Sequence, residues 1–206
     1  DDIIDVVQEE NTEDMERMAA IATTHKSYLK VGVIETWKAR IPWLLLLMVS
    51  ATFTGKIIQS YEAALSTYVI LTAFIPMLMD TGGNAGSQAS VTIIRGLSLG
   101  EVEFKDILKV IWKEIRVALF CGVTLAVANF LKLIIIDKVT LVVNIIVNVT
   151  LIFTICIAKL LGCTLPLLAK KAKLDPAVMI NPFITTLVDA WSLIIYFKIA
   201  TQLLGL

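Results

Sequence analysis

The sequence predicts an all-α membrane protein, with five transmembrane helices per subunit behind an N-terminal amphipathic helix on the cytoplasmic side. Of the 206 residues, 57% are hydrophobic, and the mean hydropathy is +0.82, whereas soluble domains are roughly 45–50% apolar. A bilayer span needs about 20 predominantly apolar residues, and the chain contains five stretches of this kind. A membrane is therefore the natural solvent for this chain.

The N-terminal segment, residues 1–25, is expected to form an acidic amphipathic helix. Residues 1–16 contain eight acidic side chains and no basic one. A solvated acidic linker is the alternative, because charge runs are commonly solvated, and a divalent-cation site among these carboxylates also remains open. The chain begins at Asp1 rather than at a methionine and shows no signal peptide, so we expect it to be part of a larger protein.

The five apolar stretches give the expected membrane spans, which are residues 41–61, 63–94, 117–136, 139–161 and 177–204. Pro42 is expected to open the first span, and Asp175 and Pro176 to cap and begin the fifth. The second stretch is too long for one straight span and contains glycines, so we expect it to be broken, tilted or partly outside the hydrocarbon. Residues 99–113 alternate charged and apolar positions at helical spacing, which is typical of a helix on the cytoplasmic surface.

The basic residues predict the orientation. With the N-terminus in the cytoplasm, thirteen lysines and arginines, Lys159 among them, flank the spans on the cytoplasmic side, and four flank them on the outside. This bias obeys the positive-inside rule. The prediction is a multi-pass protein of the inner (plasma) membrane with its N-terminus in the cytoplasm and its C-terminus outside.

Two aspartates, Asp80 and Asp189, lie inside the apolar stretches away from their ends. A carboxylate at the bilayer centre costs roughly 2.5 to 3.5 kcal/mol even on a lenient scale, so it needs a compensating role. At helical spacing, Asp189 shares one face with three other polar residues, Asn181, Thr185 and Ser192. Pro182 is expected to kink the same helix. The purely structural alternative for Asp189 is a salt bridge to Lys56.

A glycine-rich cluster follows Asp80. Gly82, Gly86 and Ser90 recur every four residues and predict a face that lets another helix approach closely. Packing explains Asn84 less well. The further amides Asn129, Asn144 and Asn148 are interpreted as interhelical hydrogen-bonding groups.

This set of polar groups predicts the kind of solute. Carboxylate, amide and hydroxyl oxygens without an opposing base favour a cation, and the lack of positioned histidine or cysteine argues against soft transition metals. Mg²⁺ keeps several of its waters and is usually held through one or two carboxylates. A largely hydrated Mg²⁺ ion therefore fits this lining.

Two longer motifs carry a resemblance to a known family. T-G-G-N-A-G-S-Q at residues 81–88, followed by I-I-R-G-L-S-L-G-E-V at residues 93–102, resembles the signature of MgtE-type magnesium channels. D-P-A-V-M-I-N-P-F-I-T-T-L-V-D at residues 175–189 resembles the fifth transmembrane helix of that family. The resemblance extends over the whole chain.

The resemblance implies a homodimer that conducts Mg²⁺ into the cytoplasm along its electrochemical gradient. It also implies cytoplasmic N and CBS domains that sense Mg²⁺, close the pore and would precede Asp1. On this interpretation residues 1–25 are a plug-like helix, residues 26–40 a basic juxtamembrane linker, and residues 41–206 the five-helix pore domain. No nucleic-acid partner is expected.

The site residues follow by the match of motifs. Asp189 corresponds to the pore aspartate of the family, Asn181 and Thr185 to neighbouring positions along the ion path, and Asn84 to an amide of the second helix. Five acids match the acidic positions of the plug helix and imply Mg²⁺ as a regulatory as well as a transported ion: Asp2, Asp5, Glu10, Glu13 and Asp14. Asp80 is outside the motif, and it either concentrates cations or caps the next turn.

Two other function classes remain as alternatives. A proton-coupled divalent-cation carrier would use the same Asp189, and the sequence does not separate it from a channel. An intramembrane aspartyl protease would need Asp80 and Asp189 to meet within hydrogen-bonding distance. Because the sequence contexts typical of such proteases are absent, we do not expect an enzyme.

Overall fold

The computed structural model describes residues 2–19, 21–22, 28–179 and 181–205, and every regular element in these ranges is helical. The all-α prediction is therefore confirmed for the described chain. The long helices are α1 (Asp2–Met18), α2 (Val33–Ser60), α4 (Ile75–Ser98), α5 (Ile107–Ile135), α6 (Leu141–Lys171) and α7 (Asn181–Leu204). The short ones are η1 (Tyr28–Lys30), α3 (Glu62–Thr67), η2 (Val69–Phe74), η3 (Phe104–Asp106) and η4 (Pro176–Met179).

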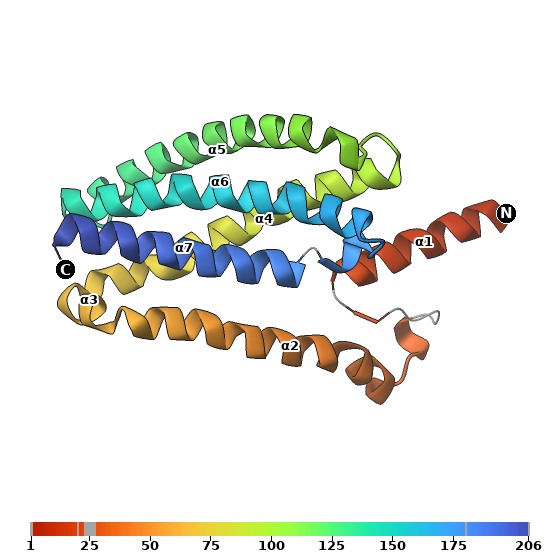
Figure 1. Ribbon diagram of the computed structural model, residues 1–206. Coiled ribbons are helices and arrows are strands. Elements are labelled where there is room, and N and C mark those ends of the chain that lie inside the picture. Colours follow the sequence, from red (N-terminus) through yellow and green to blue (C-terminus); the bar gives the residue numbers. More distant parts are fainter. Residues whose placement is uncertain (1, 20, 23–27, 180, 206) are drawn as a thin grey trace.

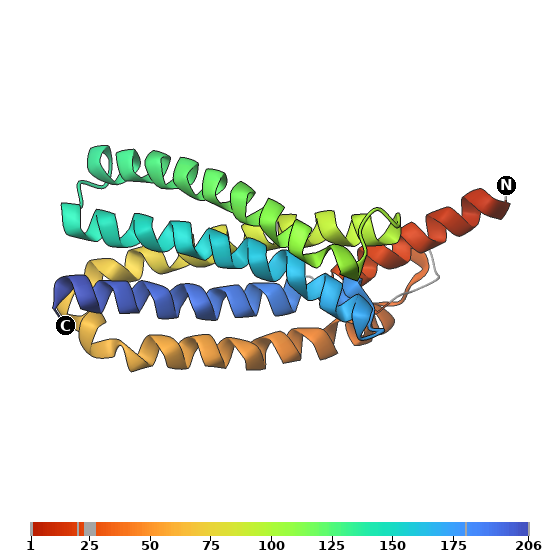
Figure 2. The same ribbon diagram turned by 45° about the horizontal axis from the view of Figure 1, so that its top comes forward.

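The long helices other than α1 run side by side as a bundle, and α1 projects from one end of it (Figures 1 and 2). Helix α6 occupies the centre and packs against α4, α5 and α7. Helix α2 lies on one side and packs mainly against α7. The core is apolar and includes the fully buried side chains of Leu78, Ile146, Ile155, Ile184 and Phe197.

Four stretches of helix are long and apolar enough to cross a membrane among the described residues: Val33–Ser60, Phe104–Ile135, Leu141–Lys171 and Phe183–Leu204. Helix α4 has 24 residues but contains the aspartate and the glycine-amide cluster, which lower its hydropathy. It nevertheless runs along the same bundle (Figure 1). Five spans therefore stay a prediction, with α4 as the one whose composition falls short.

The second predicted span is broken, as the sequence indicated. Short helix α3 and the 3-10 helix η2 precede α4, which begins at Ile75 with Pro76 in its first turn. Leu71 of η2 is fully buried, and its carbonyl oxygen accepts a hydrogen bond of 2.9 Å from the hydroxyl of Tyr196 on α7. This hydrogen bond holds η2, the segment that interrupts the predicted span, against α7 at the end of the bundle.

Two predictions about helix ends were wrong. The expected surface helix at residues 99–113 forms only in part, because residues 107–113 are the first turns of α5, which continues into the bundle, and only the short η3 precedes them. Pro42 does not open α2 but lies inside it, since the helix begins eight residues before the predicted span, at Val33. A proline inside a helix removes one backbone hydrogen bond, and α2 continues past it.

Lys159 is a third correction, because it does not flank a span at the cytoplasmic surface. Its side chain is buried within α6 and lies 3.9 Å from the carboxylate of Glu114 on α5. A buried charge needs a partner, and here the partner comes from a neighbouring helix that the local sequence does not reveal.

The small-residue face of α4 is confirmed. A Cβ placed on Gly82 would lie 2.6 Å from Thr154 of α6 and 2.7 Å from Val188 of α7. One placed on Gly86 would lie 2.7 Å from Ile184. Real Cβ atoms do not approach other atoms so closely, so these glycines allow α4 to lie against both α6 and α7.

The three amides of α5 and α6 are hydrogen-bonded, as predicted. The side-chain nitrogen of Asn129 donates to the side-chain oxygen of Asn148 at 3.0 Å, and that of Asn144 donates to the carbonyl of Phe130 at 3.2 Å. These bonds join two helices within the apolar bundle, so the amides are explained without an ion.

Candidate functional site

A polar cavity lies between α4 and α7. Its volume is about 390 Å³. Its walls are formed by Met79, Asp80, Gly83, Asn84 and Ser87 of α4 and by Thr185 and Asp189 of α7. Both aspartates of the apolar stretches therefore lie in one space.

The packing of α4 against α7 determines which residues of the two helices lie across from one another in this cavity. Gly82 lies against Val188, Gly83 against Thr185, and Gly86 against Ile184, so the residue number rises along one helix as it falls along the other. The helices are antiparallel, and this register brings Asp80 to the level of Asp189. Asn84 lies nearer the level of Thr185.

Three of the predicted path residues, Asp189, Thr185 and Asn84, line the cavity. Asn181 is the first residue of α7, but its side chain lies outside the described residues. Ser192, which the helical spacing placed on the same face, is buried instead and donates a hydrogen bond of 2.6 Å to the carbonyl of Val188. It belongs to the packing against α4.

Sequence reasoning left the role of Asp80 open and did not single out Ser87. Asp80 is the sixth residue of α4, so it does not cap a turn, and its side chain is exposed in the cavity. Asp80, Asn84 and Ser87 follow one another at intervals of four and three residues, the spacing of one helical face. From this spacing the sequence could have predicted that the three side chains share one face of the helix.

No ion pair joins Asp189 to a lysine or arginine in the part of the chain that the structure describes. Lys56 is exposed on α2 and does not form the salt bridge with Asp189 that the purely structural alternative required. Asp189 is partly buried. Its charge therefore faces the cavity without a fixed basic neighbour among those residues.

The start of α7 differs from the prediction. Asp175 accepts a hydrogen bond of 2.9 Å from the backbone nitrogen of Ala177 and so begins η4 rather than α7. Helix α7 begins at Asn181, so Asp189 lies eight residues, or about 12 Å, along it. Pro182 is the second residue of the helix, where its missing N–H costs no hydrogen bond, and the predicted kink does not form.

The size of the cavity suits a hydrated ion. Mg²⁺ prefers octahedral coordination, and six waters at about 30 Å³ each occupy roughly 180 Å³. The cavity, at about 390 Å³, has room for an ion with its waters. No group of three or more histidine, cysteine, aspartate or glutamate side chains gathers around a metal position among the described residues, and the cavity itself offers two carboxylates with neutral oxygens.

The acidic residues of α1 are only partly described. The side chains of Asp2, Asp5 and Asp14 lie outside the described residues, and Glu10 is exposed. Glu13 forms an ion pair with Arg17.

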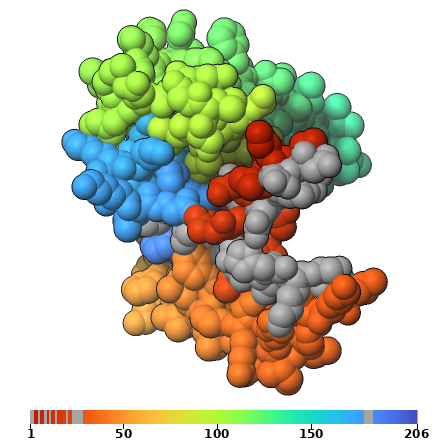
Figure 3. All heavy atoms as spheres, turned by 90° about the vertical axis from the view of Figure 1, so that its right-hand side faces the viewer, coloured from red at the N-terminus to blue at the C-terminus, as the bar shows by residue number. Residues whose placement is uncertain are grey.

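Arg17 also joins α1 to the bundle. Its guanidinium pairs with both Glu13 and Asp175, and Asp175 lies in the loop before α7. Figure 3 looks onto this end of the molecule and shows α1, in red, beside the blue connection between α6 and α7. The helix is therefore tied to the segment that leads into the cavity-lining helix.

Comparison with known proteins gives the family. Residues 75–199 match MgtE, described as a divalent cation transporter. The chain is 34% identical over 204 residues to the magnesium transporter MgtE of Thermus thermophilus, a match that covers 99% of this chain and 45% of that protein. It is 38% identical over 209 residues to the magnesium transporter MgtE of Bacillus subtilis, covering 98% of this chain and 44% of that protein.

A third relative is the magnesium transporter MgtE of Enterococcus faecalis, 32% identical over 204 residues, with 98% of this chain and 44% of that protein covered. The chain thus spans somewhat less than half the length of these relatives. Its matched region contains every residue that lines the cavity. The chain therefore belongs to the MgtE family of divalent cation transporters.

Proposed function

We propose that this chain carries the ion path of an importer that moves Mg²⁺ across the membrane into the cytoplasm. The observation that carries the proposal is the cavity between α4 and α7, into which Asp189 projects without a basic partner among the described residues. Membership of the MgtE family supports transport, and the names of the relatives support magnesium as the cargo.

The ion passes with most of its water shell in place. Asp189 attracts the positive charge and accepts hydrogen bonds from the bound waters, while Thr185 and Asn84 offer neutral oxygens beside it. Mg²⁺ dehydrates reluctantly and is commonly held through one or two carboxylates. The roughly 2.5–3.5 kcal/mol cost of a membrane carboxylate is offset each time an ion occupies the cavity. Asn181, at the start of α7, continues the path toward the cytoplasm.

A channel and a proton-coupled carrier use the same residues and differ in kinetics. We favour a channel, because open hydrated passage needs no proton exchange at the aspartate. Asp80 and Asp189 line one cavity, but no hydrogen bond of the kind that the protease alternative requires joins them among the described residues. The chain also belongs to a family described as transporters.

The proposed assembly is a homodimer in the inner membrane, with the N-terminus in the cytoplasm and the C-terminus outside. Helix α2 exposes many apolar side chains, including Leu44, Met48 and Phe53, which suit lipid or a second copy. Cytoplasmic N and CBS sensor domains complete the proposed protein. The acids of α1 then hold regulatory Mg²⁺ near Glu10 and Glu13.

The test is replacement of the cavity carboxylate. We expect Asp189→Asn to abolish Mg²⁺ uptake, because the amide keeps the shape and removes the charge that compensates the ion. Uptake is measured in cells that lack their own Mg²⁺ importers and as flux through the purified protein in liposomes, with expression and folding checked by size-exclusion chromatography.

The matched control is Asp137→Asn. Asp137 lies in the α5–α6 loop, pairs with Lys132 at 3.0 Å and does not line the cavity. Its variant is expected to transport normally. Normal uptake by Asp189→Asn at normal expression would contradict the proposed function.

A further inference from the structure

We propose that Asp80 is a second ion-binding carboxylate of the same path and sets its preference for divalent over monovalent cations. This inference rests on the proposed function and assigns a role to a residue on the helix opposite Asp189. The observation behind it is the shared cavity, to which α4 and α7 each contribute one carboxylate.

The register of the two helices places these carboxylates at one level. The contacts of Gly82 with Val188 and of Gly83 with Thr185 put Asp80 across from Asp189. An ion at this level has an acid on either side. Because Coulomb attraction scales with the product of the charges, a divalent ion gains twice as much from each carboxylate as a monovalent ion does.

The next level of the path is neutral. Asn84 and Ser87 lie one and two turns beyond Asp80 toward the end of α4 at Ser98, and Thr185 lies one turn before Asp189 on α7. Conduction requires binding that is strong enough for entry and weak enough for release. A doubly acidic level followed by an uncharged one meets both requirements, since the ion leaves the strong field as it moves inward.

Asp80 is available for this role. It is exposed in the cavity, and no described lysine or arginine forms an ion pair with it. Its position in the second turn of α4 lies toward the end of the bundle that holds α3. That end is the outer one in the proposed orientation, so an arriving ion meets Asp80 and Asp189 before the neutral residues.

The experiment compares Asp80→Asn with wild type in liposomes, with flux measured over a range of external Mg²⁺ concentrations. We expect the half-saturating Mg²⁺ concentration to rise on the order of fivefold, the effect of one charge on a divalent ion held a water shell away. The Mg²⁺-to-K⁺ permeability ratio, from reversal potentials, is expected to fall. Asp80→Glu keeps the charge and is expected to stay close to wild type in both measurements.

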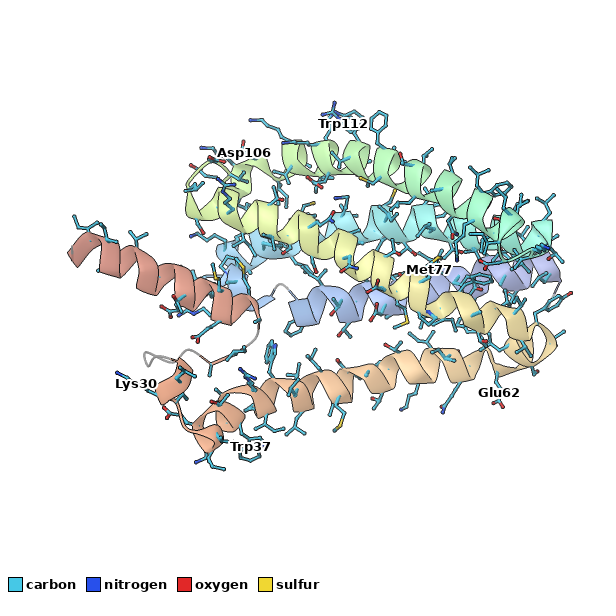
Figure 4. All side chains as sticks on the ribbon, turned by 180° about the vertical axis from the view of Figure 1, so that it is seen from behind. Lys30, Trp37, Glu62, Met77, Asp106 and Trp112 are labelled. Atoms are coloured by element: carbon cyan, nitrogen blue, oxygen red, sulfur yellow. The ribbon has the colours of Figure 1, made fainter. Side chains whose placement is uncertain are left out.

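Glu62→Gln is the control for general surface charge. Glu62 is exposed on α3 at the same end of the bundle and points away from it (Figure 4), and it does not line the cavity. An unchanged half-saturating concentration in Asp80→Asn, or an equal shift in Glu62→Gln, would overturn the inference. If Asp80→Asn does not fold, Asp80→Ser carries the same test.

The two proposals fail in different ways. Full Mg²⁺ flux in Asp189→Asn contradicts the proposed function whatever Asp80 does. Lost flux in Asp189→Asn together with wild-type affinity and selectivity in Asp80→Asn contradicts only the role of Asp80.

Discussion

Gly162 marks the tightest approach between α4 and α6. A Cβ at this position would lie 2.3 Å from the carbonyl oxygen of Gly86 and 3.0 Å from the side chain of Ala89. The first of these atoms belongs to the backbone, so it cannot move aside as a flexible side chain would. One missing methyl group therefore sets the distance between the central helix and the helix that carries Asp80.

Gly162→Ala is expected to destabilise the protein by about 1–3 kcal/mol, the usual cost of overpacking a tight core. The measurement is thermal unfolding in detergent. The matched variant is Gly55→Ala, because Gly55 also lies inside a helix but has open space around its Cβ position. Alanine favours helix over glycine by up to about 1 kcal/mol, so Gly55→Ala is expected to unfold at or above the wild-type temperature. Equal unfolding temperatures for the two variants would contradict this account of the α4–α6 contact.

At the scale of the elements, α5 and α6 are joined by charge as well as by apolar packing. Lys159 and Glu114 have side-chain exposures of 7% and 12%, so each depends on the other for compensation of its charge. Removing one partner of a buried pair leaves the other uncompensated, whereas replacing both removes the problem.

Lys159→Met is accordingly expected to lower stability by about 3–5 kcal/mol, and the double variant Lys159→Met with Glu114→Gln to recover most of that loss. A double-mutant cycle of unfolding free energies measures the coupling. If the double variant is as unstable as the sum of the two single ones, the pair is not coupled and the side chains act independently.

The sequence predicted most of the helices but only part of how they pack against one another. Apolar length alone locates the bundle, and helical spacing correctly places Thr185 with Asp189. The level of Asp80 depends on the register between α4 and α7, which Gly82 and Gly83 set through contacts with a distant helix. The periodic pattern of residues within one helix does not reveal how that helix is aligned with another.

The burial of Lys159 could not be predicted for the same reason. A lysine near the end of an apolar stretch usually reaches the interface, and its partner Glu114 lies 45 positions earlier in the chain. Pro42 marks the start of the apolar stretch but not of the helix, because α2 begins at Val33 and includes the charged residues that precede that stretch.

At the scale of the whole molecule, the orientation can be tested at two loops. Lys138 follows α5 and Lys173 follows α6, and both have positive φ values, 50° and 59°, in exposed connections. If α6 crosses the membrane with the proposed orientation, these two positions face opposite sides. A membrane-impermeant maleimide is expected to label Lys138→Cys on intact cells and Lys173→Cys only after permeabilisation.

The background for this experiment lacks the native thiols Cys121, Cys156 and Cys163, each replaced by alanine. Labelling of both positions from outside would contradict the crossing of α6. Labelling of Lys173→Cys alone on intact cells would reverse the proposed orientation.

The ion pair between Arg17 and Asp175 connects α1 to the segment that precedes α7. Asp175 lies six residues before Asn181, and Asp189 lies two turns further along the same helix. On the proposed function, a displacement of α1 would therefore pull, through Arg17, on the connection that precedes the helix carrying Asp189.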